Sequence, residues 1–190
     1  MNNDRNITFM CILVILFASC APSQSSIQTA IAQTEIANST ATALFVESFR
    51  SQIEASLFQP GDLPNNWTNG PITTDLPDGP LYDILPTADL TTNEPIINTT
   101  YDRAGFILVL FYTNSSDLEK AYSGLFVGTL IPDFAEKAKS MTVGETGEWN
   151  DVAFVRCSTI VFIKIYGLYK SDIIDYAIRL DRRLINAICK

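Results

Sequence analysis

Residues 105–113, Gly-Phe-Ile-Leu-Val-Leu-Phe-Tyr-Thr, decide the fold of this chain. The run is continuously apolar and rich in aromatic and β-branched residues, which is typical of a central strand buried on both faces. Residues 95–101 before it predict a partner strand, joined to it through residues 102–105. The sequence therefore predicts a β-hairpin at the centre of the fold.

A helix is predicted directly after this hairpin. Residues 116–119, Ser-Asp-Leu-Glu, form a capping box that opens it. Its apolar positions at helical spacing are Leu118, Ala121, Tyr122 and Leu125. Beyond Pro132, residues 133–139 are expected to add one or two helical turns.

The C-terminal part predicts two more strands and a helix. Residues 152–157 and 159–166 read as antiparallel strands with a tight turn near Ser158. Ser171 or Asp172 is expected to cap the final helix. One stripe of that helix is apolar, formed by Ile173, Ala177, Leu180, Leu184 and Ile188, and the residues expected to face water are Asp175, Arg179, Arg182 and Arg183.

The basic residues of this last helix allow two interpretations. Residues 151–190 hold seven basic and four acidic residues, whereas the chain as a whole has a net charge of −8. The basic helix face is either an ordinary solvated surface or a surface turned toward anionic lipid or an acidic partner.

The region before the central hairpin has two parts. Leu44, Phe45, Phe49, Ile53 and Leu57 recur at helical spacing and predict a helix over residues 40–58. A loop rich in Pro and Gly follows over residues 59–95, with a short edge strand expected at 81–85. Trp67 within this loop is either a core residue beneath it or a platform on which a ligand stacks.

Strands bracketed by helices, without regular βαβ alternation, predict an α+β fold. We expect an antiparallel sheet with helices packed on it, forming a single domain over residues 44–190. A helical tether over residues 20–43, poor in charge and without aromatic residues, precedes this domain.

The N-terminus predicts an address outside the cytoplasm. Residues 7–18 are an almost unbroken apolar run of the length of a signal-peptide core. The following Leu16-Phe-Ala-Ser-Cys20 resembles the lipobox of bacterial lipoproteins, in which the cysteine is acylated and becomes the mature N-terminus. The resemblance implies a signal peptide at residues 1–19, lipidation of Cys20 and a membrane anchor on the extracytoplasmic face of a bacterial envelope.

Two other interpretations of this segment stay open. A plain cleaved signal peptide, or a short uncleaved anchor, would leave Cys20 an incidental thiol.

Removing Cys11 with the signal and Cys20 with the lipid leaves Cys157 and Cys189. In an oxidising compartment we expect these two to form a disulfide, and the alternative is two unpaired buried thiols.

Residues 60–190 also resemble a known class of domain in the order of their predicted elements. A hairpin, a helix, an Arg-Cys strand running into an apolar strand, and a closing amphipathic helix resemble the extracytoplasmic sensor-type domains of bacterial lipoproteins and of some bacterial serine/threonine kinases. PsbP-like folds are more distantly similar. The resemblance implies a small α+β domain with an exposed cleft that binds rather than catalyses.

Composition excludes several other function classes. The chain of 190 residues has no histidine, which removes Ser-His-Asp triads, Cys-His dyads and His-ligated zinc sites. The net charge of −8 argues against binding to nucleic acid. We expect no enzyme activity, no cofactor and no metal site.

The expected function is therefore that of a lipid-anchored extracytoplasmic binding or sensor domain. Its partners would be the membrane, through the lipid, and an unknown small molecule or envelope protein. The rival interpretation is a structural or assembly lipoprotein that docks on an envelope protein. A ligand receptor should have a partly apolar pocket, for which the candidate ligand contacts are the aromatic residues Trp67, Tyr101, Tyr112 and Trp149.

Overall fold

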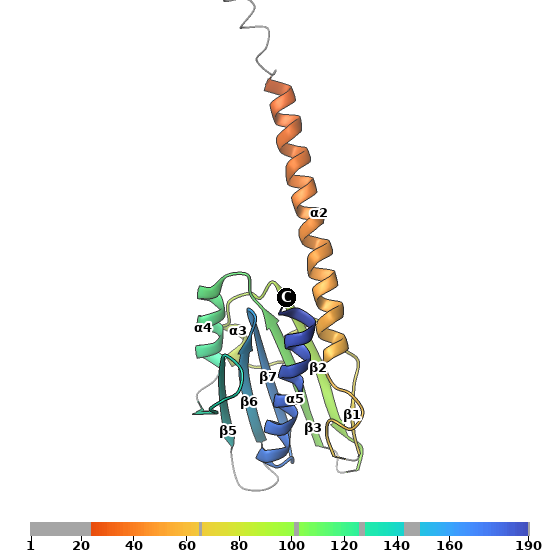
Figure 1. Cartoon of the computed structure of the whole chain (residues 1–190), viewed down its shortest axis with the longest axis vertical. Helices are drawn as coiled ribbons and strands as arrows, with labels where there is room; N and C mark the ends of the chain where they lie inside the picture. The colour runs from red at the N-terminus through yellow and green to blue at the C-terminus, as the bar shows by residue number, and fades with distance from the viewer. Residues whose placement is uncertain (1–23, 65, 101–102, 126–127, 143–148, 190) are drawn as a thin grey trace, which may run out of the picture. The chain divides into compact units, whose positions relative to one another are not determined.

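The computed structural model describes residues 24–189 except 65, 101–102, 126–127 and 143–148. The chain divides into two units, residues 1–45 and 46–190. Its helices are α2 (Gln24–Ser56), α3 (Pro80–Asp83), α4 (Ser115–Leu125) and α5 (Lys170–Ile188) (Figure 1). Its strands are β1 (Trp67–Asn69), β2 (Leu90–Asn98), β3 (Arg103–Phe111), β4 (Thr129–Leu130), β5 (Lys137–Thr142), β6 (Trp149–Arg156) and β7 (Thr159–Tyr166).

The strands form one antiparallel sheet in the order β1-β2-β3-β7-β6-β5-β4. The predicted α+β class is thereby confirmed, as are the hairpins β2–β3 and β6–β7. The predicted signal peptide and Cys20 lie outside the described residues. Across the described residues, no helix has the length and hydropathy that a membrane span requires.

The central strand β3 is buried on both faces, as predicted. Its residues alternate between two hydrophobic clusters, because successive side chains of a strand point to opposite faces. Ile107, Val109 and Phe111 enter the cluster beneath α5, which we call the α5-side core. Leu108 and Leu110 enter the cluster beneath α4, which we call the α4-side core. The domain therefore has helices on both faces of its sheet.

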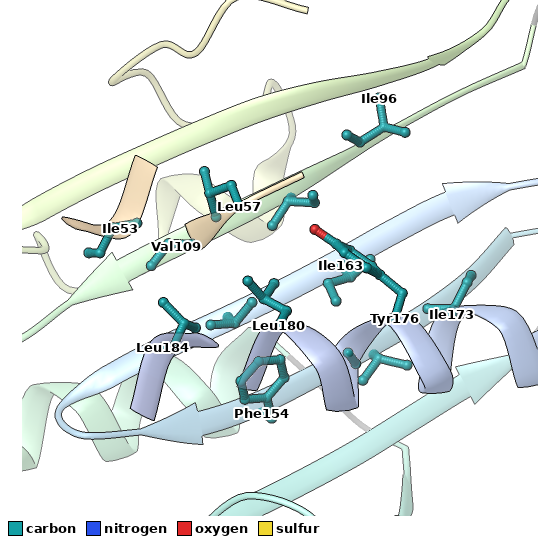
Figure 2. Packing of buried hydrophobic residues seen from close by; sticks show 14 of the residues in the cluster. Ile53, Leu57, Ile96, Val109, Phe154, Ile163, Ile173, Tyr176, Leu180 and Leu184 are labelled. Atoms are coloured by element: carbon teal, nitrogen blue, oxygen red, sulfur yellow. The ribbon is translucent and has the colours of Figure 1, made fainter. Parts of the chain in front are cut away.

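The α5-side core joins α5 to the sheet and to the last turns of α2 (Figure 2). From α5 it takes Ile173, Tyr176, Ala177, Leu180 and Leu184, and from α2 and the residue after it Phe49, Ile53 and Leu57. The predicted cap of α5 is wrong, because the helix begins at Lys170 with Tyr169 in the N-cap position and no side-chain cap. The backbone N–H groups of Asp172 and Ile173 instead donate to the Tyr169 carbonyl.

The α4-side core contains the predicted apolar stripe of α4, Leu118, Ala121, Tyr122 and Leu125. The helix itself is confirmed, but its predicted capping box is not its start. Asn114 precedes the helix, and its Oδ1 accepts the N–H of Ser116 at 2.8 Å. An asparagine in this position satisfies an N–H that has no partner within the helix.

Two predicted elements are wrong. Residues 81–85 do not form an edge strand, because Pro80 opens the one-turn helix α3, and proline's fixed φ suits a first helical turn. Residues 133–139 do not add helical turns. Asp133 and Ala135 have positive φ, and Lys137 begins β5, which pairs with β6 along its length. Pairing at the sheet edge overrides the local helical preference there.

A disulfide bond joins the β6–β7 turn to the C-terminal end of α5. Cys157 and Ser158 form its two-residue loop and have φ of 48° and 62°, as a tight hairpin turn between twisted strands requires. Cys157 is joined by a disulfide to Cys189, the C-cap of α5, with a Cα–Cα distance of 5.6 Å. The bond ties α5 to the sheet at one end of the domain.

Arg183 of α5 does not face water, contrary to the sequence prediction. Its guanidinium donates to the carbonyls of Ser56 and Leu57, each at 2.8 Å, and to both carboxylate oxygens of Asp62, at 2.9 and 2.6 Å. The last carbonyls of a helix have no partner within it. Arg183 therefore satisfies the C-terminus of α2, and the nearby Arg179 donates to the Asp62 carbonyl. These two arginines are engaged within the domain.

Replacing Arg183 by Met should lower the free energy of unfolding by about 2–4 kcal/mol, because the buried carboxylate of Asp62 loses two hydrogen bonds and the carbonyls of Ser56 and Leu57 lose their donor. Urea denaturation measures the change. The matched control is Arg182→Met at the exposed neighbouring position, for which we expect a change within about 0.5 kcal/mol. Equal effects of the two substitutions would contradict the role given to Arg183.

Removing the disulfide by replacing Cys157 and Cys189 with Ser should lower the free energy of unfolding by about 4 kcal/mol. The chain-entropy model gives this value for a sequence separation of 32 residues. Urea denaturation with and without reductant measures the change. Reductant should destabilise the wild-type chain and leave the double variant unchanged. If reductant does not change the stability of the wild-type chain, the stabilising role of the disulfide is contradicted.

Candidate functional site

The two faces of the sheet are covered unequally. At about 1.5 Å per residue, the 19 residues of α5 extend about 28 Å, close to the about 30 Å of the nine-residue strand β3. The 11 residues of α4 extend only about 16 Å. Among the described elements, α4 and the one-turn helix α3 therefore cover only part of this face, and they leave an open half with exposed side chains.

The open half lies at the ends of the strands where β6 begins and β7 ends. On the α5 side of this end, Val152, Ile96 and Ile165 are at most 1% exposed. On the α4 side, the side chains of neighbouring residues at the same ends of the strands are exposed. They are Ile97 (43%), Met141 (39%), Trp149 (39%) and Tyr166 (37%), together with Ala104. We call this surface the open face.

The aromatic residues of the open face lie together. Trp149 and Tyr166 are cross-strand partners, with ring centroids 5.4 Å apart and planes at 62°. Lys164, two residues before Tyr166, holds its Nζ 5.1 Å from the centroid of the Trp149 ring. Its side chain is 31% exposed. The face thus presents two aromatic rings with a cation between β6 and β7.

Asp151 lies at the base of the open face and is 3% exposed. It is the cross-strand partner of Lys164, whose Nζ is 4.0 Å from Asp151 Oδ2. That distance is an ion pair without a hydrogen bond. Asp151 Oδ1 is buried and has no hydrogen-bond partner among the described residues. A buried carboxylate with so few partners costs free energy.

The other buried acids of the described chain are satisfied. Glu94 accepts the N–H of Phe58 at 3.0 Å and the amide of Asn69 at 2.7 Å. Asp181 accepts two hydrogen bonds from Arg156, at 2.7 and 2.8 Å, and Asp62 accepts two from Arg183. Of the four acids buried within the described residues, Asp151 is therefore the poorly satisfied one.

Burial raises the pKa of Asp151 to about 6, and the charge of Lys164 opposes part of that rise. The carboxylate also acts on its surroundings. Burial, and secondarily the charge of Asp151, raises the pKa of Tyr82 in α3 to about 12. Tyr82 packs edge-on against Phe106 at 6.3 Å, at the border between the open face and the α4-side core. A buried acid whose pKa is shifted by burial and by a nearby charge, next to exposed aromatic rings, is a candidate for a functional site.

No protein-family model, curated protein or solved structure matches this chain. The chemistry of the open face therefore follows from its own residues.

The four aromatic residues that the sequence proposed as ligand contacts lie in different places. Trp149 lies on the open face. Trp67 packs against the α5-side core, which is the first of its two interpretations. Tyr112 is 2% exposed in the α4-side core and donates its hydroxyl to the Pro86 carbonyl at 2.9 Å. Tyr101 lies outside the described residues. The structure therefore brings none of the other described candidates to Trp149.

Sequence reasoning missed Asp151, Lys164 and Tyr166 as site residues. A signal was present, because Lys164 is the charged residue within an otherwise apolar strand. The predicted turn near Ser158 did not fix the exact register, on which the pairing of residue 151 with 164, and of 149 with 166, depends.

A hollow separate from the open face lies beside α4, with a volume of about 490 Å³. Tyr122, Ile131 and Phe134 line it, and Lys139 holds its Nζ 5.2 Å from the Tyr122 ring. Three of its rim charges are engaged, since Lys137 pairs with Glu119, and Glu136 accepts the N–H of Cys157. Within the described ranges, no group of three acidic or cysteine side chains is placed to hold a metal ion.

Asp151→Asn should stabilise the protein near pH 7.5, by about 1–3 kcal/mol. Because the folded pKa of about 6 exceeds the ordinary 3.8, the contribution of this carboxyl to stability is full below pH 3.8 and is lost as the pH rises through about 6. The substitution should therefore change little near pH 3.5. Urea denaturation at the two pH values measures the effect.

The matched control is Asp181→Asn, which removes the charge partner of Arg156 and should destabilise the protein near pH 7.5. Destabilisation by Asp151→Asn at that pH would show that Asp151 is an ordinary structural acid.

Proposed function

We propose that this chain is a lipid-anchored extracytoplasmic binding or sensor domain without enzyme activity. The observation that carries the proposal is the poorly satisfied carboxylate of Asp151 on the same sheet face as the exposed ring pair Trp149–Tyr166, at the next same-face pair of the register. A group that costs stability in the free protein, next to exposed aromatic rings, is expected where a ligand supplies the missing interactions. The lipobox-like segment ending at Cys20 supports the anchor and the address.

A second candidate function is docking on an envelope protein. Ile97 and Met141 extend the exposed apolar surface beside the ring pair, and a broad surface of this kind suits a protein partner. The basic face of α5 gives this alternative less support than the sequence suggested, because Arg183 and Arg179 bind within the domain. Binding of a ligand through the open face remains the function we favour.

Native mass spectrometry of the full chain, extracted from its own envelope in mild detergent, tests the proposal. We expect an adduct that is released on denaturation and is absent from Trp149→Ala, because the ring supplies much of the contact. The control is Tyr169→Ala, which removes an aromatic residue that is 62% exposed at the start of α5 and should keep the adduct.

An adduct retained by Trp149→Ala would place the binding site elsewhere. A protein that crosslinks in the envelope to the wild type and to Tyr169→Ala, but not to Trp149→Ala, would favour docking over a small ligand.

A further inference from the structure

We propose that the open face binds a guanidinium group, which pairs with Asp151 and stacks on the rings of Trp149 and Tyr166. This inference rests on the proposed function and names the chemical class of the ligand. The guanidinium belongs either to a free small molecule or to an arginine side chain of a peptide. In the structure described here, Lys164 occupies the place that the ligand cation would take.

The position of Lys164 shows that the face holds a cation. Its Nζ is 5.1 Å from the Trp149 ring centroid, within the range of a cation–π contact, and 4.0 Å from Asp151 Oδ2. A carboxylate and an aromatic face together attract positive charge and repel anions. The open face therefore favours a bound cation, and the ammonium of Lys164 is such a cation within the chain itself.

Lys164 satisfies this site poorly. At 4.0 Å it makes no hydrogen bond to Asp151 Oδ2, and Asp151 Oδ1 has no partner within the described chain. An ammonium is a point charge, whereas a guanidinium offers two parallel N–H groups in the geometry of the two carboxylate oxygens. Its planar, weakly hydrated surface also stacks on aromatic rings. A guanidinium can thus supply both hydrogen bonds that Lys164 leaves unmade.

Binding requires Lys164 to move aside and uncover Asp151. The Lys164 side chain is 31% exposed and lies on a flexible four-carbon stem, so that its ammonium can turn to solvent. The backbone beneath it is held closely, because Gly105 of β3 lies against β7, and a Cβ there would be 2.7 Å from the Ile165 Cα. The side chain can move while its strand stays in place.

The charged and titratable groups that face Asp151 come from three elements. Lys164 lies on β7 and Tyr82 lies on α3. Lys139 lies on the same sheet face, on β5, two residues before Met141, which is the cross-strand partner of Asp151. Burial raises the pKa of Asp151 to about 6, so we expect its carboxylate to be ionised near pH 8. Binding should therefore weaken as the pH falls through 6, and the tests are made near pH 8.

The test is titration of the full chain with agmatine, a guanidinium compound without a carboxylate. The chain has two tryptophans, so Trp67→Phe leaves Trp149 as its tryptophan fluorophore. We expect a saturable fluorescence change with agmatine and an affinity at least about tenfold weaker for butylamine, since an ammonium cannot form the paired hydrogen bonds. Tyr169→Ala is the control and should bind agmatine normally.

Two variants separate a binding role from a structural one. Asp151→Asn should weaken agmatine binding at least about tenfold, although it is expected to stabilise the fold. Lys164→Met should strengthen binding about three- to tenfold, because the internal competitor is gone. A variant that merely damaged the sheet would not bind more tightly.

Absence of saturable agmatine binding, equal binding by Asp151→Asn, or equal affinity for butylamine would each overturn the guanidinium proposal. If the envelope adduct still depends on Trp149 in that case, the proposed function stands and only the ligand class falls. The peptide acetyl-Ala-Ala-Arg-Ala-Ala-amide distinguishes the two sources, because tighter binding than agmatine indicates an arginine in a polypeptide and weaker binding a free small molecule.

Discussion

The structure depends on two central strands, β3 and β7, that are apolar on both faces. Ile107 and Val109 point to one side of the sheet and Leu108 and Leu110 to the other, and all four are at most 1% exposed. Side chains that alternate in this way can leave water only if each face of the sheet is covered. The need to cover both faces places α5 and the end of α2 on one side and α3 and α4 on the other.

The cover on the α5 side is complete and strongly fastened. Arg183 joins α5 to the carbonyl end of α2 and to Asp62, and the Cys157–Cys189 disulfide joins the far end of α5 to the β6–β7 turn. The cover on the α4 side is shorter than the strands it lies on. The uncovered strand ends carry Trp149, Tyr166, Lys164 and Asp151, and the candidate site is a direct consequence of this mismatch in length.

Asp151 shows how the domain combines a stable core with a costly residue. Glu94, Asp181 and Asp62 are buried as deeply or nearly so, yet each accepts at least two hydrogen bonds. Asp151 has an ion pair beyond hydrogen-bond distance and an oxygen without a partner in the described part of the chain. The rest of the fold supplies the stability that this site gives up, and the open face is where a bound cation would restore it.

The sequence by itself determined the α+β class, the two central hairpins, and the apolar stripes of α4 and α5, because each follows from local periodicity or turn chemistry. The choice between the two interpretations of Trp67 came from the structure, in which it packs against the α5-side core. Residues 81–85 and 133–139 were predicted wrongly, since α3 and β5 depend on packing and edge pairing. The Arg183 side chain points into the domain because it pairs with Asp62, which is 121 residues away in the sequence. Only the tertiary structure placed Asp151 opposite Lys164 and on the same sheet face as Trp149, because the exact strand register and the position of α4 on the sheet depend on contacts between residues that are distant in the sequence.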